Sequence, residues 1–413
     1  MRVRPLIGTL GVLGLLASCG RSSLDDPPMA HDSLCHDGTL AGASTPAVAF
    51  CSDGSHRAPT LAPIAPHEVW SVHIETTRPF VVDERGTIHG PGFVVADGVV
   101  ASRPNASGSV AFLDRAGRVV GREVVDHEMA LVTRTHDGIP AHVVVPLPVP
   151  GWDLAGAPGS DDTVDLTIER RGPLSTSIGW VERIDARGTP RFAVDTGCVP
   201  VDGDVDTPTT ILRLASGDLA SACGGKRASV VVRAFDDTGA STVSMEVAAV
   251  GVASNMAQTP DGALAVVTSD ADGPSKLWIL RPPAVVAALS LSEGGAAYLA
   301  VAHDGTVVVR SSHDVLAFAA TDDHWALRFR VPTFSINPSP PMGGVAQSQL
   351  FVDAESTLVT WGAVLEGRSL DDGTLRFRVT PAKSDSFTYV TAAGPRALYA
   401  ATNDGTIMLL RDR

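Results

Sequence analysis

The sequence is poor in aromatic residues and has no long apolar run. Aromatic side chains make up 5% of its 413 residues, with 6 Trp and 3 Tyr, so it has little of the stacking surface that quinone and sugar sites need. Its apolar runs stay below the length of about 18 residues that an ordinary membrane-spanning helix requires. The formal net charge is −14, and a chain this acidic is not expected to bind nucleic acid.

The N-terminus has the layout of an export signal. Arg2 and Arg4 precede a short apolar stretch from Leu6 to Leu16. The sequence Leu16-Ala-Ser-Cys19 resembles the lipobox of bacterial lipoproteins, in which the chain is cut before the cysteine and the cysteine is acylated, for instance with palmitate. The resemblance implies that residues 1–18 are a signal peptide and that Cys19 is the lipidation site. An ordinary signal peptide that contains a cysteine is the alternative.

The resemblance also implies a location. Gly20, rather than Asp, follows the cysteine, which in Gram-negative lipoproteins favours the outer membrane, with the protein facing the periplasm or the cell surface. The acidic chain would be repelled by anionic lipid, so the lipid has to hold it at the membrane.

The remaining cysteines number four: Cys35, Cys51, Cys198 and Cys223. An even number in an exported protein predicts two disulfides, and proximity in the sequence favours Cys35–Cys51 and Cys198–Cys223 over the other two connectivities. A zinc site is disfavoured because the chain has no CxxC and no Cys/His pair at zinc spacing.

Composition and the pattern of apolar runs divide the chain into a leader, a tether and a folded body. Residues 19–66 are rich in Asp, Pro, Ser, Ala and His without a sustained period, which predicts a flexible tether holding one of the disulfides. Residues 67–413 consist of short alternating apolar runs separated by turns, which predicts an all-β body. Ten Asp-Gly steps supply the positive φ of tight turns, and they begin at Asp37, Asp53, Asp97, Asp137, Asp202, Asp261, Asp272, Asp304, Asp372 and Asp404.

Internal repeats define the architecture. The segment Ala326–Pro332 recurs as Thr374–Thr380, 48 positions further on, and Thr189–Val194 is a third, weaker copy. Each copy follows a strand and a tight turn, and further strands lie upstream. Four short strands per repeat, at a spacing of roughly 40–50 residues, predict a β-propeller of four-stranded antiparallel blades.

Two further segments of the folded body resemble the repeats of a known family. Pro91–Ala101 and Arg396–Leu410 resemble the repeats of quinoprotein-like (PQQ-like) propellers: apolar strand, Asp-Gly or a similar turn, apolar strand. The resemblance extends over residues 67–413. It is informative about architecture only, because enzymes and pure scaffolds share this repeat.

The hairpins allow the blades to be counted. Five end at Gly117, Gly188, Gly239, Asp323 and Gly373, and a sixth lies near Trp278–Leu291. Residues 386–413 lack one strand, which the orphan strand at 67–74 would supply, closing the ring and covering two sheet edges. We therefore expect seven blades, with eight as the alternative, since Glu128–Arg171 has room for another.

The candidate catalytic groups do not form a known site. PQQ dehydrogenases hold the quinone against a disulfide between adjacent cysteines, and no two cysteines are adjacent here. The chain has no GxSxG or HExxH motif, and His127, His136 and His142 have no regular metal spacing. We therefore expect neither an enzyme nor a bound cofactor.

Two acidic loops are the candidate metal sites. In both loops solvated turns are favoured over calcium sites. The loop at Asp270 and Asp272 lacks the further Glu that a calcium loop has after its glycine. The carboxylates of the two loops are Asp202, Asp204, Asp206, Asp270 and Asp272.

The function predicted from the sequence is a lipid-anchored, non-catalytic propeller that binds an envelope protein. By resemblance, one PQQ-like propeller lipoprotein serves as a scaffold in outer-membrane β-barrel assembly. The alternative is a ligand-binding or catalytic quinoprotein or sugar-type propeller that uses its central cavity. The longest predicted loops are Pro146–Asp162, in which Trp152 is a candidate contact for a partner, and Pro332–Gly344.

Overall fold

The structure is a computed structural model of the 413-residue chain. It describes residues 61–413 except for gaps at 75–79, 83–85, 91, 103–108, 114–118, 125–128, 137–138, 149–151, 159–162, 172–176, 186, 198–209, 225–228, 249–251, 270–274, 292–297, 312, 322–323, 334–348 and 383–385. Within these bounds the regular secondary structure is entirely β, and no helix there is long and apolar enough to cross a membrane.

The described strands form eight antiparallel sheets of four strands each. The first four sheets are β2 (Val81–Val82), β3 (Ile88–Gly90), β4 (Phe93–Ala96) and β5 (Val99–Ser102); β6 (Ser109–Leu113), β7 (Val119–Val124), β8 (Met129–His136) and β9 (Ile139–Pro146); β10 (Trp152–Pro158), β11 (Val164–Arg171), β12 (Ser177–Ile184) and β13 (Pro190–Asp195); β14 (Thr210–Arg213), β15 (Leu219–Gly224), β16 (Ser229–Phe235) and β17 (Ser241–Ala248).

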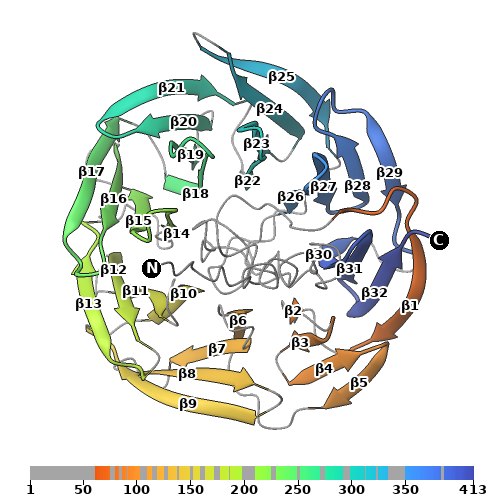
Figure 1. Cartoon of the computed structure of the whole chain (residues 1–413), viewed down its shortest axis with the longest axis horizontal. Helices are drawn as coiled ribbons and strands as arrows, with labels where there is room; N and C mark the ends of the chain where they lie inside the picture. Colours follow the sequence, from red (N-terminus) through yellow and green to blue (C-terminus); the bar gives the residue numbers. More distant parts are fainter. Residues whose placement is uncertain are drawn as a thin grey trace, which may run out of the picture.

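The remaining sheets are β18 (Val252–Gln258), β19 (Leu264–Ser269), β20 (Lys276–Arg281) and β21 (Ala284–Ser290); β22 (Tyr298–Val301), β23 (Val307–Arg310), β24 (Asp314–Ala320) and β25 (Trp325–Pro332); β26 (Leu350–Val352), β27 (Thr357–Trp361), β28 (Leu365–Ser369) and β29 (Leu375–Val379); and β30 (Phe387–Gly394), β31 (Ala397–Thr402) and β32 (Thr406–Arg411) together with β1 (His67–His73). The sheets stand around a common axis, with the first strand of each nearest the centre (Figure 1). The predicted propeller of four-stranded antiparallel blades is confirmed.

The preferred number of seven blades is wrong, because the described residues form eight four-stranded sheets. The hairpin predicted at Val110–Gly117 lies between β6 and β7, the first two strands of its blade, whereas the other predicted hairpins join third and fourth strands. A complete blade, β2–β5, precedes it. Its last two strands belong to the segment Pro91–Ala101 that resembles a propeller repeat, but its first two strands are only two and three residues long, so they gave little alternation to recognise in the sequence.

The N-terminal strand joins the last blade. β1 pairs antiparallel with β32, with Trp70 opposite Leu409 and Val72 opposite Ile407. The backbone N–H of Ile74 continues the contact by donating to the carbonyl of Gly405 at 2.9 Å. β1 is thus the outer strand of a sheet whose other three strands come from the C-terminus (Figure 1), which places both ends of the propeller in one blade.

Residues 61–66, predicted as the end of the tether, lie against the propeller. The backbone N–H groups of Ile64 and Ala65 donate to the carboxylate of Asp412 at 2.7–3.1 Å. The backbone N–H of Arg396 donates to the carbonyl of Leu61 at 2.8 Å. These contacts hold the chain in place before β1 begins.

The repeated Leu-Arg-Phe-Arg-Val segment is the outer strand of its blade. Its phenylalanine points inward and is buried, as Phe329 in β25 and Phe377 in β29. A Cβ on Gly367 would lie 2.0 Å from the ring of Phe377, so only glycine fits opposite it. Packing of the ring on the blade therefore accounts for the repeat that is visible in the sequence.

The tight turns have the predicted chemistry where the structure describes them. Asp97 and Gly98 both have positive φ, 49° and 76°, as a two-residue hairpin turn requires. The described Asp-Gly steps that begin at Asp261, Asp304, Asp372 and Asp404 also place their glycine at positive φ. The other five steps lie outside the described residues.

Candidate functional site

Most residues singled out from the sequence fall outside the part of the chain that the structure describes. They are Cys19, Cys35, Cys51, Cys198, Asp202, Asp204, Asp206, Asp270, Asp272 and His127. The roles of the cysteines in lipidation and disulfides stay predictions, and so does the expectation that the acidic loops are solvated turns rather than calcium sites. Among the described residues, no three His, Cys, Asp or Glu side chains are grouped so as to hold a metal ion.

Cys223 is the predicted disulfide cysteine that the structure describes. It lies on β15 and is buried. Cys198 is not among the described residues, so the disulfide Cys198–Cys223 remains a prediction.

The predicted loop Pro146–Asp162 contains a strand instead. Trp152 is the first residue of β10, the innermost strand of its blade, and its side chain is not described. The role of Trp152 as a partner contact is therefore untested. His136 and His142 lie on β8 and β9, and their side chains are likewise not described.

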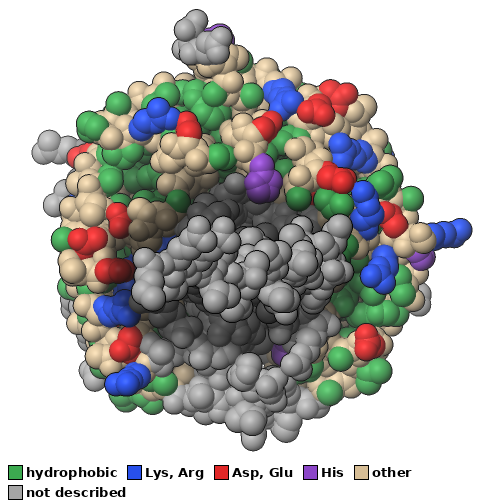
Figure 2. Space-filling model, in the orientation of Figure 1, with side chains coloured by type: hydrophobic (Ala, Val, Ile, Leu, Met, Phe, Trp, Pro, Cys, Tyr) green, Lys and Arg blue, Asp and Glu red, His purple; other side chains and the backbone are tan. Residues whose placement is uncertain are grey.

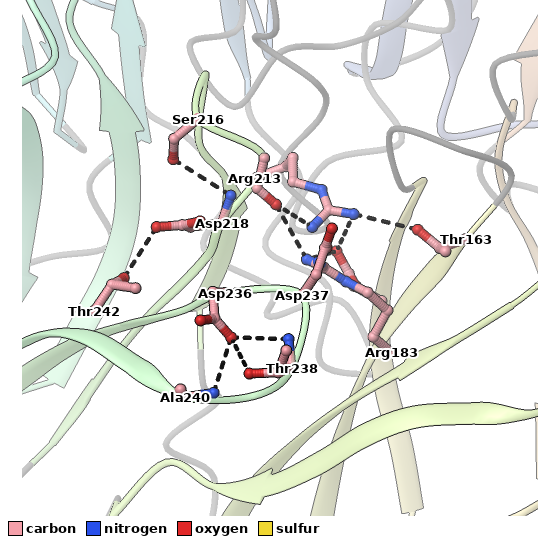
Figure 3. Close-up of polar contacts among 12 residues, drawn as sticks. Thr163, Arg183, Arg213, Ser216, Asp218, Asp236, Asp237, Thr238, Ala240 and Thr242 are labelled. Atoms are coloured by element: carbon pink, nitrogen blue, oxygen red, sulfur yellow. Dashed lines mark hydrogen bonds and ion pairs between the residues drawn. The ribbon is translucent and has the colours of Figure 1, made fainter.

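In the part of the chain that the structure describes, the strongest concentration of buried charge lies between the blades β10–β13 and β14–β17 (Figure 3). Arg183 at the end of β12 and Arg213 at the end of β14 have fully buried side chains, and so has Asp165 of β11. Arg183 Nε donates to Asp165 Oδ1 at 2.6 Å, and Arg213 Nη2 lies 3.4 Å from Asp165 Oδ2. One carboxylate therefore serves two guanidinium groups that come from neighbouring blades.

The rest of this cluster is completed by turns. Arg183 also pairs with Asp237 of the β16–β17 turn, and Arg213 Nη1 donates to the carbonyl of Gly217 in the β14–β15 turn at 2.5 Å. Arg213 Nη2 donates to Thr163 Oγ1 at 3.3 Å. Because these donors point at protein oxygens, the cluster ties two blades together, and the buried charges are compensated.

A second buried arginine ties two other blades. Arg310 at the end of β23 donates through Nη1 to the carbonyl of Gln349 at 2.7 Å and to that of Trp361. Burial lowers the pKa of Arg310 to about 10, against the attraction of Tyr298 and Glu366. Its Nε atom and the indole Nε1 of Trp361 have no partner, so this interface retains unused buried donors, each of which costs free energy.

Sequence reasoning missed both arginine clusters. Asp165 stands between Val164 and Leu166 at the start of an apolar strand. An acidic residue in such a position indicates a buried carboxylate that needs a partner. The identity of its partners depends on which blades are neighbours, and the sequence does not contain that information directly.

The outer surface of the ring differs from strand to strand. Acidic and basic side chains are interspersed with hydrophobic ones around the rim in Figure 2. Three of the described outer strands carry no Asp, Glu, Lys or Arg, namely β5 (Val-Val-Ala-Ser), β9 (Ile-Pro-Ala-His-Val-Val-Val-Pro) and β21 (Ala-Val-Val-Ala-Ala-Leu-Ser), and of these β5 and β21 also lack histidine and proline. Val99 of β5 is 69% exposed, the most of any described large hydrophobic side chain. These two strands present apolar side chains beside unpaired backbone.

Comparisons with known proteins identify the fold. No protein-family model and no curated protein matches the sequence. The structure is similar to that of BamB from Moraxella catarrhalis, with a TM-score of 0.53 and 15% identity, over 84% of this chain and 100% of that one. It is also similar to quinohemoprotein alcohol dehydrogenase from Comamonas testosteroni, with a TM-score of 0.59 and 10% identity, over 92% of this chain and 82% of that one. At these identities the likeness shows a shared PQQ-like propeller fold.

Proposed function

We propose that the chain is a lipid-anchored, non-catalytic propeller of the bacterial envelope that acts as a scaffold by binding another protein. The lipid on Cys19 holds it at the outer membrane. Residues 20–60 span from the lipid to the propeller. The partner is another envelope protein, and neither nucleic acid nor a cofactor is involved.

The observation that carries the proposal is the contrast between the inside of the blades and the rim. Inside, Arg183 and Arg213 form ion pairs with Asp165, and Arg213 also donates to a carbonyl of a neighbouring turn. Outside, β5 exposes Val99 and Val100 beside an unpaired strand edge. An exposed uncharged edge suits the addition of a strand or loop from another protein.

The likeness to BamB supports an envelope scaffold. The likeness to a quinohemoprotein alcohol dehydrogenase supports the alternative, a ligand-binding or catalytic propeller. In that alternative the central cavity binds a quinone or a sugar. The absence of adjacent cysteines and the small number of Trp in the sequence count against a quinone site of the dehydrogenase type.

Purification of the full lipidated chain tests the proposal. After cross-linking in intact cells, we expect mass spectrometry to find a specific envelope protein bound in a constant ratio. The same preparation is assayed for metals, quinones and sugars. A stoichiometric small molecule without a protein partner would replace the scaffold by the alternative.

The anchor is tested separately with Cys19→Ala. We expect the variant to leave the membrane fraction, whereas Cys223→Ala, which removes a cysteine of the propeller, should stay there to the extent that it folds. Equal membrane retention of the Cys19→Ala variant would rule out the lipid anchor without touching the proposed partner binding.

A further inference from the structure

β21 is an outer strand whose unpaired edge has no charged residue and no proline. It pairs with β20 on one side only, with Leu289 opposite Leu277 and Ala288 opposite Trp278. Its seven residues include no charge and no proline. Val285 and Val286 are about half exposed, at 44% and 50%, so the strand combines an unpaired backbone with an apolar surface.

The other long outer strands carry residues that discourage edge pairing. Each of them contains a charged, histidine or proline residue: Glu68 in β1, Pro140 and His142 in β9, Arg191 in β13, Glu246 in β17, Arg328 in β25, and Arg376 in β29. β5 also lacks charge, but it is only four residues long. Among the described outer strands, β21 is the long one without such a residue.

We propose that β21 is a self-association site, at which two copies of this chain pair antiparallel across a two-fold axis. An antiparallel pair of identical strands has this symmetry by construction. With Ala287 on the axis, Val286 of each copy faces Ala288 of the other, and Val285 faces Leu289. Apolar side chains then meet at these central positions, and Ala284 faces Ser290 at each end.

The charge of the chain is the reason for proposing a second copy of it as the partner of β21. Two chains of net charge −14 repel one another over most of their surfaces, so they can approach where charge is missing. The same two-fold pairing through β29 would set Arg376 against Arg378 of the second copy. At the start of β21, the exposed Arg281 is already paired with Asp261, which leaves the strand end electrically neutral.

The size of the contact indicates a weak dimer. One strand pair with its apolar side chains is smaller than a standard interface of about 1,600 Å², so the dimer should depend on concentration. Confinement to a membrane would raise the effective concentration. Only this last step rests on the proposed lipid anchor; the pairing itself does not.

Sedimentation velocity of the full chain in mild detergent, over a range of concentrations, measures the association. Val286→Lys brings two like charges to diagonal positions across the pair, and we expect dimerisation to weaken by about tenfold or more. Val144→Lys on β9 is the matched control, since Val144 is 54% exposed on another outer strand, and it should dimerise like the wild type. A wild type that stays monomeric, or a Val286→Lys variant that dimerises like the control, would overturn the proposal.

Cysteine cross-linking tests the register and does not depend on the charge substitution. Under mild oxidation, Ala287→Cys should give a disulfide-linked dimer because the two copies of residue 287 meet at the axis. Ala284→Cys should not, because its two copies would lie about 20 Å apart at ~3.3 Å per residue. Equal cross-linking at both positions, or a cross-link to a different protein in place of the dimer, would contradict self-pairing.

Discussion

The backbone N–H of Ala62 donates a 2.7 Å hydrogen bond to Oδ2 of Asp353, which lies 291 residues further along the chain. The other oxygen of Asp353 accepts from the backbone N–H groups of Glu355 and Thr357 in its own turn. One buried carboxylate therefore shapes the β26–β27 turn and fixes the segment that leads into β1. Burial nevertheless raises the pKa of Asp353, against the effect of these hydrogen bonds.

Replacing this carboxylate should release the N-terminal segment. For Asp353→Ala we expect a loss of about 2 kcal/mol in the free energy of unfolding, since a buried hydrogen bond to a charged group is lost. The amide of Ala62 should exchange faster with solvent. Glu355→Gln, which alters an exposed neighbour, is the control. Unchanged exchange at Ala62 in Asp353→Ala would show that the contact does not hold the segment.

Removal of β1 should affect the whole propeller. A chain that begins after residue 74 leaves β32 as an exposed edge and uncovers the apolar face on which Trp70 and Val72 pack. We expect it to aggregate or to unfold at a clearly lower temperature. A chain that begins at residue 61 keeps β1 and should melt close to the full chain. Equal melting temperatures for the two truncations would contradict a structural role of β1.

The buried arginine cluster should be far more sensitive than a surface pair. Asp165→Asn leaves Arg183 and Arg213 buried without their shared carboxylate, and breaking such a network costs about 3–5 kcal/mol. Asp261→Asn removes the partner of the exposed Arg281, and the expected loss is about 1 kcal/mol or less. Urea unfolding measures both. Similar losses would mean that the buried charges are solvated in the folded protein.

Acid should destabilise the propeller through its turn carboxylates. Hydrogen bonds from the hydroxyl and backbone N–H of Thr238 lower the pKa of Asp236, and those of Thr374 lower the pKa of Asp372. Their contribution is complete above the ordinary pKa of 3.8 and is lost as the pH falls through the lower pKa of the folded state. Asp353, whose pKa is raised, contributes with the opposite sign.

The test is the melting temperature between about pH 6 and pH 2. The double variant Asp236→Asn, Asp372→Asn should show a shallower fall on acidification than the wild type. Both carboxylates are solvent-exposed, so screening keeps the effect modest. Parallel curves would show that these two turns do not contribute.

The sequence predicts the propeller because each blade repeats the same local chemistry. Alternating apolar strands and Asp-Gly turns can be recognised from neighbouring residues, and a buried phenylalanine (Phe192, Phe329 or Phe377) gives the outer strands β13, β25 and β29 a repeated pattern. The blade number was missed because β2 and β3 are too short to give a pattern, so the repeat at Pro91–Ala101 was not counted as a blade of its own. A hairpin inside the next blade was then placed at the wrong position in its repeat.

The contacts between blades could not be read in the same way. The hydrogen bond between Ala62 and Asp353, and the sharing of Asp165 by Arg183 and Arg213, join residues far apart in the chain. They follow from the ring arrangement and from the side on which each strand ends. The sequence marks such residues only as polar groups in apolar surroundings.

Photo-cross-linking in intact cells from position 99 on β5 tests the proposed scaffold most directly. Val99 is the most exposed large hydrophobic residue that the structure describes, and the same probe at position 375 on β29, where Leu375 is 44% exposed beside paired arginines, is the comparison. A scaffold that binds through this uncharged strand should give one specific cross-linked envelope protein from position 99 and little or none from position 375. No cross-linked protein from either position, with a tightly bound small molecule in the purified chain, would contradict it.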